Sequence, residues 1–476
     1  MPVKYDKLPE NPFMVPSVFE DLKRRWNKNN ILAATEGAVF LPLLETEEDD
    51  FPWAAVTAMI PGEADSECAR TSKLTGSAVL TNDSDLLLHD LGSHGSVLLL
   101  NSVELSEWNS LRPIESNIKA KRLSPKLLAC RLGINNIHHF AYELRKNPRL
   151  GLSELIRRSK NDQNSLEATP DYREFVEEYN CVSNAQPVMI QLPQHIDPRI
   201  SELLFQLFQL FQLRGVHLPG FVPHMYLAIL NEDHSRRCAW EDGHLYRVLG
   251  YSVFNLSFPA TGRCEFVDEH VRRGGRIAIN RITLGDEEWI TAEVRALGER
   301  LNSMGTVFDG DVSSPCFWTL FAISDIYGLE TRTAVLKVEQ LCRFLSLGYM
   351  GKKLEWEDIH LHARINAVLY SMRILSQALE VMSLTEGPML KTKSILAALP
   401  PLHVMMRSRR EMTMEVSSDI MNKVSRDFLC FFDQHNQAAQ TVQPSHVGQD
   451  STILHDQGKN GDTRRETNPY EFLSLE

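Results

Sequence analysis

The sequence predicts an α/β domain, then a mostly α-helical region and a disordered tail. Apolar strand-like runs alternate with helix-like segments up to about residue 160, which is the pattern of an α/β domain. Helical periodicity dominates from about residue 186 to 433, and the chain after Gln434 is rich in Gln, Asn, Ser, Asp and Gly. Such a tail buries too little apolar surface to fold. The predicted parts are therefore a domain over 1–160, a polar linker over 161–185, a helical domain over 186–433 and a tail over 434–476.

The first strands and helices follow from short apolar runs and their turn residues. Val15 to Trp26 predicts a helix, Ala38 to Leu44 a short buried strand, and Ala54 to Ile60 a strand that ends at Pro61-Gly62. A proline at this point favours the start of a helix, which we expect over residues 63–74.

The next two strands frame a cluster of acids. Ala78 to Leu80 predicts a strand that ends just before Asp83 and Asp85, and Gly92 to Gly95 turns the chain into a strand over Val97 to Leu100. We expect the two strands to form a hairpin.

Four carboxylates mark a candidate metal site. Glu63 and Asp65 open the helix over 63–74, and Asp83 and Asp85 follow the strand Ala78 to Leu80. Ligands gather at the carboxyl ends of strands in an open α/β sheet. Carboxylates that converge there repel one another unless a hard divalent cation such as Mg²⁺ lies among them. The sequence therefore predicts a Mg²⁺ or Mn²⁺ site of the kind that acts on phosphodiesters.

A basic segment follows over residues 118–160. It contains 11 Lys or Arg residues against two acids, Glu143 and Glu154. It also predicts two or three short helices, with Ser124-Pro125 and Ser153 as N-terminal signals. One interpretation is a nucleic-acid surface beside the metal site; the other is the solvated face of amphipathic helices, and the sequence favours neither. The candidate nucleic-acid-binding residues are Lys119, Lys121, Arg122, Lys126, Arg131, Arg145, Lys146, Arg157 and Arg158.

Composition limits the class of protein. The 476 residues allow two or three domains with cores of their own. A formal net charge of −12 argues against a uniformly basic nucleic-acid coat, but it permits a local basic patch. The eight cysteines form no CxxC pair, so free thiols are expected. No signal peptide or membrane span is evident, which predicts an intracellular protein of the nucleus or cytoplasm that is not secreted.

The order of the acidic motifs resembles a known family. Pro-Gly-Glu63-Ala-Asp65, a helix, and then Val-Leu-Thr-Asn-Asp83-Ser-Asp85 are similar to the internal region of the XPG/flap-endonuclease family, especially its asteroid-like branch and the fungal proteins with an asteroid-type XPG domain. Two segments of the helical half, Ser235 to Glu241 and Arg272 to Arg276, also resemble these proteins. The resemblance implies a PIN-like α/β fold.

The resemblance further implies that the four acids are ligands for divalent metals that activate water for phosphodiester cleavage. Two features depart from the family. No Asp-Gly at the end of an apolar strand precedes Glu63, so the PIN-like domain is expected to be N-terminally incomplete. No Asp occurs from Leu91 to Asn161, and the Gly-rich DNA-binding hairpin survives at most as a remnant near Gly133.

Two functional hypotheses follow from the sequence. The first is a nuclease-like protein whose acids hold Mg²⁺ or Mn²⁺ weakly, as a single ion, with weak or absent turnover as a structure-specific nuclease. The second is a non-catalytic scaffold that binds DNA or RNA through the basic segment, or proteins through the helical region and the C-terminal tail. The sequence leaves open whether the protein is an enzyme.

Overall fold

The structure is a computed structural model that describes most of the chain up to Phe432. The described residues are 11–34, 51–60, 64–105, 118–160, 169–179, 196–212, 222–306, 311–328, 337–382, 387–405 and 422–432. The helices and strands named below all lie in the compact unit Met1–Phe431. The predicted strand over 38–44, most of the linker over 161–185 and the tail over 434–476 lie outside the described residues.

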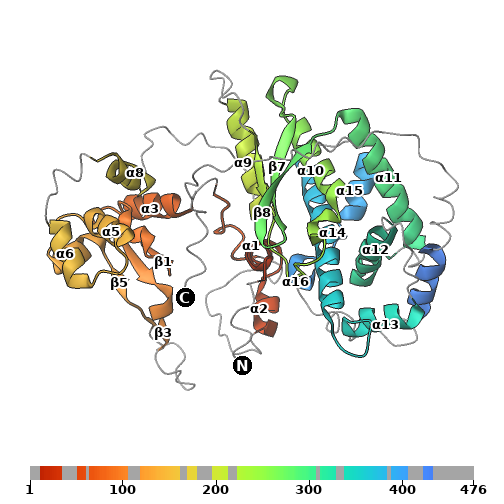
Figure 1. Ribbon diagram of the computed structural model, residues 1–476, viewed down its shortest axis with the longest axis horizontal. Coiled ribbons are helices and arrows are strands. Elements are labelled where there is room, and N and C mark those ends of the chain that lie inside the picture. Colours follow the sequence, from red (N-terminus) through yellow and green to blue (C-terminus); the bar gives the residue numbers. More distant parts are fainter. Residues whose placement is uncertain are drawn as a thin grey trace, which may run out of the picture. The chain divides into compact units, whose positions relative to one another are not determined.

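Small sheets and short helices make up the α/β part of the chain (Figure 1). The elements are α3 (Ala64–Thr75), β1 (Ala78–Thr81), η1 (Asp85–Leu88), β2 (Ser96–Leu99), η2 (Leu100–Ser102), β3 (Glu104–Leu105), β4 (Ile118–Lys119), β5 (Arg122–Leu123), α4 (Pro125–Leu132), α5 (Ile137–Lys146), α6 (Leu152–Lys160) and α8 (Pro170–Tyr179). The predicted helix over 63–74, the two predicted strands and the short helices of the basic segment are thus confirmed, with Ser124 as the residue before α4.

The predicted hairpin between the first two strands is wrong. β1 and β2 run parallel, with Ala78 opposite Ser96 and Thr81 opposite Leu99, and β5 then pairs antiparallel with β2. Parallel strands require a crossover connection, and here η1 supplies it through Leu86, Leu87 and Leu88, which are all buried. Because β1 and β2 are parallel, their carboxyl ends lie at the same edge of the sheet.

Two apolar clusters stabilise this part. Leu86, Leu87, Leu91 and Val97 pack with Ala69 of α3 between the helix and the sheet. Leu88 instead packs with the aromatic side chains of α5 and α8, namely Tyr142, Tyr172 and Phe175. The short η1 helix therefore anchors the segment after Asp85 on both sides, and fixes where that acid lies.

The predicted strand over Ala54 to Ile60 is also wrong. Residues 51–60 form turns and irregular backbone. The carbonyl oxygens of Ala54 and Thr57 instead accept hydrogen bonds from the Lys23 ammonium group. A side chain thus satisfies backbone groups that a strand would have paired in a sheet.

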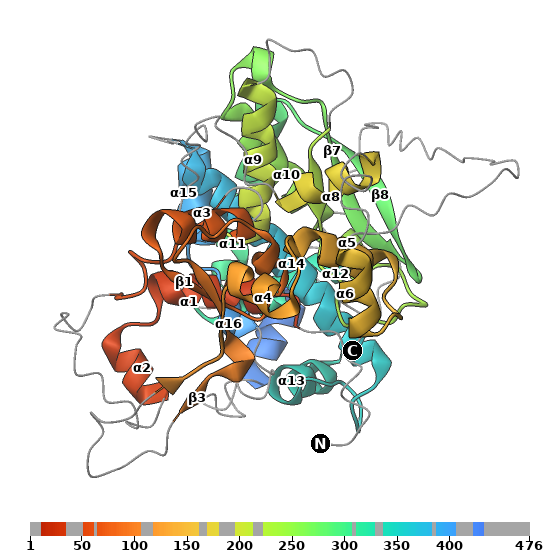
Figure 2. The same ribbon diagram turned by 90° about the vertical axis from the view of Figure 1, so that its left-hand side faces the viewer.

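The second half is mostly helical, as predicted, and contains one small sheet (Figures 1 and 2). Its elements are α9 (Pro198–Gln212), β6 (His224–Tyr226), η5 (Ala239–Glu241), α10 (His244–Leu256), η6 (Ala260–Gly262), β7 (Phe266–Arg273), β8 (Arg276–Thr283), α11 (Glu287–Gly305), α12 (Pro315–Gly328), α13 (Val338–Leu347), α14 (Trp356–Val381), α15 (Pro388–Leu396) and α16 (Leu402–Met405). α14 is the buried centre, and α10 packs along it so closely that a Cβ at Gly250 would lie 2.8 Å from Ile374.

The sheet in this half was not predicted. β7 and β8 form a long antiparallel hairpin around Gly274-Gly275, and β6 pairs parallel with β7. The segment Arg272 to Arg276, one of the two that resemble the family, is therefore a strand-to-strand turn in which Gly274 has a φ of 62°.

The first helix, α1 (Met14–Arg24), packs against the second half of the chain, and α2 (Lys28–Ala34) follows it. The Phe13 ring lies 5.0 Å from that of Tyr370 in α14, and Glu20 forms an ion pair with Arg373 of the same helix. His403 of α16 lies 3.4 Å from Asp21. The helix predicted over Val15 to Trp26 is confirmed, but its contacts are with residues near position 400.

Two expectations from composition can be checked on the described residues. Among them, no helix combines the length and apolar character that crossing a bilayer requires. The seven cysteines in the described ranges are all free thiols.

Candidate functional site

The acidic site is built where α3 begins and β1 ends. α3 runs back along β1 after a tight turn at Gly76, whose φ is 72°. The Ser72 hydroxyl closes this turn with a 2.7 Å hydrogen bond to the Ser77 carbonyl oxygen. Because the helix and the strand run in opposite directions, the first turn of α3 lies near the carboxyl end of β1. This arrangement brings Asp65 toward the residues that follow β1.

Asp83 and Asp85 are held by a compact turn. The Asp83 backbone N–H donates to the Thr81 hydroxyl at 2.9 Å, and the Asp83 carboxylate accepts from the Asp85 backbone N–H at 2.9 Å. The neighbouring Asn82 side chain accepts from the Asn101 backbone N–H at 2.7 Å, which ties the end of β1 to the end of β2. The two aspartates therefore stand at the shared edge of the parallel strands.

The charges at this edge influence one another. Partial burial, together with Asp83 and Asp65, raises the pKa of Asp85 above its usual value, while His89 and Arg145 oppose the rise. A raised pKa means that the ionised form of Asp85 is disfavoured where it lies, as expected for carboxylates brought together. The predicted convergence of these three acids is consistent with this mutual effect.

Three residues of the site were missed in the sequence. Burial and the nearby Asp85 raise the pKa of Tyr179 in α8 to about 12. His89 packs edge-on against Tyr179 with ring centroids 5.6 Å apart. Arg145 of α5 lies over the Phe175 ring and forms a 2.9 Å ion pair with Glu178. No motif marks His89, which directly follows η1, or Tyr179, which α8 brings to the acids. Arg145 was predicted only as a nucleic-acid contact.

The metal prediction is only partly covered by the structure. Glu63 lies outside the described residues. Within the described ranges, no group of three or more His, Cys, Asp or Glu side chains is arranged to hold a metal ion. Asp65, Asp83 and Asp85 therefore share one end of the sheet and one electrostatic environment without forming a closed ligand shell.

The predicted basic residues are all exposed, but five of the nine already have a partner. Arg145, Arg157 and Arg158 already pair with acids, the latter two with Glu154 at 2.7 and 2.9 Å. Arg122 donates to the Ser96 hydroxyl at 2.7 Å, and Lys146 lies over the Tyr142 ring. The remaining side chains have no ion-pair partner among the described residues; they are Lys119, Lys121, Lys126 and Arg131.

The Gly133 remnant joins two of these basic helices. Gly133 ends α4 with a φ of 63°, and the Asn136 side chain caps α5 by accepting from the His138 backbone N–H. α4, this short turn and α5 therefore form a helical hairpin that carries Lys126 and Arg131.

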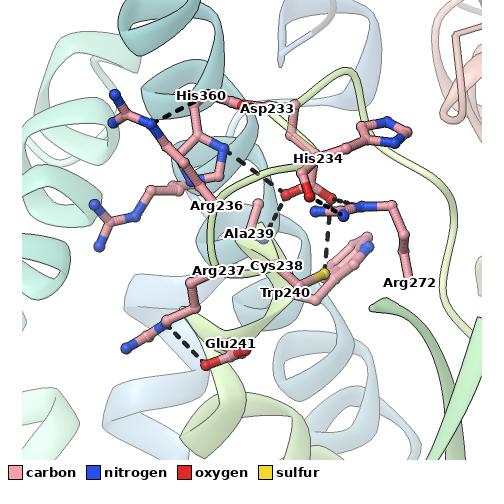
Figure 3. A network of polar contacts seen from close by, with 12 residues as sticks. Asp233, His234, Arg236, Arg237, Cys238, Ala239, Trp240, Glu241, Arg272 and His360 are labelled. Carbon is pink, nitrogen blue, oxygen red and sulfur yellow. Dashed lines mark hydrogen bonds and ion pairs between the residues drawn. The ribbon is translucent and has the colours of Figure 1, made fainter. Parts of the chain in front are cut away.

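The Ser235 to Glu241 segment is a structural element. The buried Glu232 carboxylate accepts from the Arg272 Nε at 2.8 Å, from the Ala239 backbone N–H at 2.7 Å and from the Cys238 thiol at 3.6 Å. Figure 3 shows Arg272, Cys238, Ala239 and His360 around this one carboxylate. Burial raises the pKa of the Cys238 thiol to about 11, so it stays protonated and able to donate. Arg272 is thus buried and binds Glu232 through its Nε inside the fold.

Comparison with known proteins identifies the class. A family model described as XPG domain containing matches residues 10–284. This region includes the acidic edge, the basic helices and the β6–β7–β8 sheet. Neither a curated protein sequence nor a solved structure showed significant similarity to the chain. The chain belongs to the XPG-domain-containing family, and its ancestry is nuclease-like.

Proposed function

We propose that this chain is a nuclease-like XPG-domain protein whose acidic edge binds one Mg²⁺ or Mn²⁺ weakly and hydrolyses nucleic acid slowly or not at all. The observation that carries the proposal is the convergence of Asp65, Asp83 and Asp85 at the carboxyl end of parallel strands, where burial first and then the other two acids raise the pKa of Asp85. A divalent cation relieves such repulsion, and oxygen ligands suit Mg²⁺. The PIN-like fold and the asteroid-like branch are part of this proposal.

The residues that would hold the cation are Asp65, Asp83 and Asp85, together with Glu63. When bound, such a cation supplies Lewis-acid polarisation of a phosphate oxygen. In-line hydrolysis usually needs a second ion about 3.5–4 Å away. The sequence from Leu91 to Asn161 contains no Asp that would add a ligand after β2, which supports weak or absent turnover.

Metal binding is expected to depend on the two aspartates after β1. The double variant Asp83→Asn/Asp85→Asn should weaken Mn²⁺ binding by at least about tenfold, because it removes two of the converging charges. Calorimetric titration of the full chain with MnCl₂ and MgCl₂ measures this. Asp90→Asn is the matched control, because Asp90 closely follows Asp85 in the sequence but pairs with Lys73 at 2.6 Å, at the other end of α3. Equal affinity in wild type and the double variant would exclude the site.

The same variants test turnover. Flap, hairpin and single-stranded substrates are incubated with the wild-type chain in Mg²⁺ and in Mn²⁺. The expected result is little or no cleavage. Sustained cleavage that disappears in the Asp83→Asn/Asp85→Asn variant, but not in Asp90→Asn, would replace the proposal with that of an active nuclease.

A second candidate function is non-catalytic nucleic-acid binding by the basic segment over residues 118–160. The observation in its favour is the group of exposed cations without an ion-pair partner among the described residues, which includes Lys121 and Lys126. A cation that no acid already neutralises can release counterions when it meets a phosphate.

Charge reversal distinguishes this surface from the paired cations. Lys121→Glu/Lys126→Glu is expected to weaken duplex binding and to reduce the slope of log affinity against log salt by about 0.9 for each lost phosphate contact. Arg157→Glu/Arg158→Glu is the control, and it should change the slope less, because Glu154 already pairs with both side chains. Fluorescence anisotropy across a salt series measures both. A larger effect from the control pair would reject this assignment of the surface.

A further inference from the structure

The β8 strand forms an open edge of the sheet in the helical half. The strand order is β6-β7-β8, so among the described strands β8 pairs on one side only. β8 is eight residues long, from Arg276 to Thr283, and most of its side chains are exposed. An unpaired edge presents a row of backbone N–H and C=O groups that can pair with another chain.

The outward face beside this edge carries two exposed isoleucines near the turn, next to an ion pair between Arg281 and Asp268. Ile277 is 46% exposed and Ile279 is 58% exposed. Ile279 lies opposite His270 in β7, and His270 lies opposite Tyr226 in β6, so the three side chains form one row across the sheet. Tyr226 is itself 45% exposed and stacks on His270 with centroids 4.2 Å apart. A sheet face in contact with water normally carries polar side chains, so this row has the character of a contact surface.

The charge at the turn end of the edge is positive. The hairpin contains two acids, Asp268 and Glu269, and both are buried. Asp268 pairs with Arg281, and Glu269 with Arg247. The arginines at the turn are exposed instead: Arg273, whose guanidinium donates to the Asn280 side chain, and Arg276. A partner that covers this edge would therefore meet apolar side chains and cations, with the hairpin's own acids already paired.

We propose that the β8 edge binds an extended peptide in which aliphatic and acidic residues alternate, as an added strand of the sheet. Ladder hydrogen bonds to the β8 backbone groups that no described strand pairs supply affinity, and alternate side chains supply specificity. On one face of the added strand, aliphatic side chains cover Ile277 and Ile279. On the other face, acidic side chains meet Arg276. This inference does not depend on the acidic site or on nuclease ancestry.

The test uses the full chain and a labelled peptide in which valine and glutamate alternate over the length of β8. Binding is measured by fluorescence anisotropy. The variant Ile277→Lys/Ile279→Lys is expected to weaken binding by at least about tenfold, because it places charge on the apolar stripe. Both side chains are exposed, so the variant is expected to fold. Leu354→Lys is the matched control, because Leu354 is 55% exposed but lies outside the sheet, and it should leave binding unchanged.

Further probes separate this mode of binding from others. A peptide N-methylated at alternate residues cannot donate ladder hydrogen bonds, and a lysine-for-glutamate peptide has the wrong charge; neither should bind. Absence of binding by the first peptide, or equal binding by the N-methylated one, would overturn the proposal. The proposal would also be overturned if the Ile277→Lys/Ile279→Lys variant bound the peptide as well as the wild type. In that case a loss of single-stranded oligonucleotide binding, or of dimerisation, in the variant would identify the occupant of the edge instead. The Mn²⁺ titration should be unchanged in that variant, so the two proposals fail independently.

Discussion

Replacement of Glu269 by alanine is expected to lower the free energy of unfolding by about 3–5 kcal/mol. Glu269 is fully buried, and it accepts hydrogen bonds from Arg247 at 2.6 and 3.1 Å and from the Tyr251 hydroxyl at 2.8 Å. Arg247 is only 2% exposed, so the variant leaves a buried guanidinium without its counter-ion. Urea unfolding followed by tryptophan fluorescence measures the change.

The double variant Arg247→Leu/Glu269→Leu is the control for this prediction. A buried ion pair replaced as a whole by apolar side chains often costs little, so the double variant should be clearly more stable than Glu269→Ala. A loss below about 1 kcal/mol in Glu269→Ala would show that the pair is not buried as described.

The pH dependence of this pair has a defined sign. Burial opposes ionisation of Glu269, but Arg247 and Tyr251 outweigh it and hold the pKa of the carboxyl below its usual value. The stabilisation is therefore present above the unfolded pKa of about 4.3 and is lost as the pH falls through the lower folded value.

Replacement of Trp240 by alanine is expected to lower the free energy of unfolding by about 3–5 kcal/mol, because it removes core contacts. The indole is 2% exposed and its Nε1 donates to the Ala228 carbonyl oxygen at 2.6 Å. Its ring packs edge-on against Tyr370, and Arg247 lies over it at 5.6 Å. The alanine variant leaves a cavity and also an unsatisfied carbonyl group.

Trp356 provides the matched control. It is 62% exposed, so Trp356→Ala should shift the midpoint of thermal unfolding far less than Trp240→Ala, when both are followed by circular dichroism. Equal shifts in the two variants would contradict the placement of Trp240 in the core.

The helices were predictable from the sequence, whereas the strand pairings were not. Helical periodicity predicted a mostly helical region over 186–433, and α11, α13 and α14 all lie in it. The glycines from Gly92 to Gly95 suggested a hairpin, but the buried leucines of η1 make a parallel crossover instead. Local turn chemistry cannot specify which way the following strand runs when buried contacts decide it.

The β7–β8 hairpin was missed because its core face carries a charge. Glu269 faces the interior beside Val267 and Val271, which interrupts the alternation by which strands are recognised. The Gly274-Gly275 pair was the one local signal of a hairpin turn. Only the position of Arg247, on another element, explains how a carboxylate is accommodated there.

Only the part of the acidic site that lies in neighbouring segments could be predicted, because distant elements supply the rest. Motif spacing placed Asp65, Asp83 and Asp85 near one another, because the α3–β1 connection is short and local. His89 and Tyr179 entered the site through the packing of η1 and α8 on α5, which no single segment encodes. The pairing of Arg157 and Arg158 with Glu154 depends on the helical spacing of α6, so it could not be predicted without the bounds of that helix.

The contacts of α1 impose an order on biosynthesis. Glu20 and its partner Arg373 are separated by 353 residues, and translation proceeds at about 5–20 residues per second. The interval between the synthesis of α1 and that of α14 is therefore about 20–70 s. During that interval the face of α1 that packs on Tyr370 and Arg373 has no native partner there. A chaperone is consequently expected to bind the nascent chain at this amphipathic helix. Protease sensitivity at the helix should also differ more between ribosome-bound and completed chains than it does elsewhere.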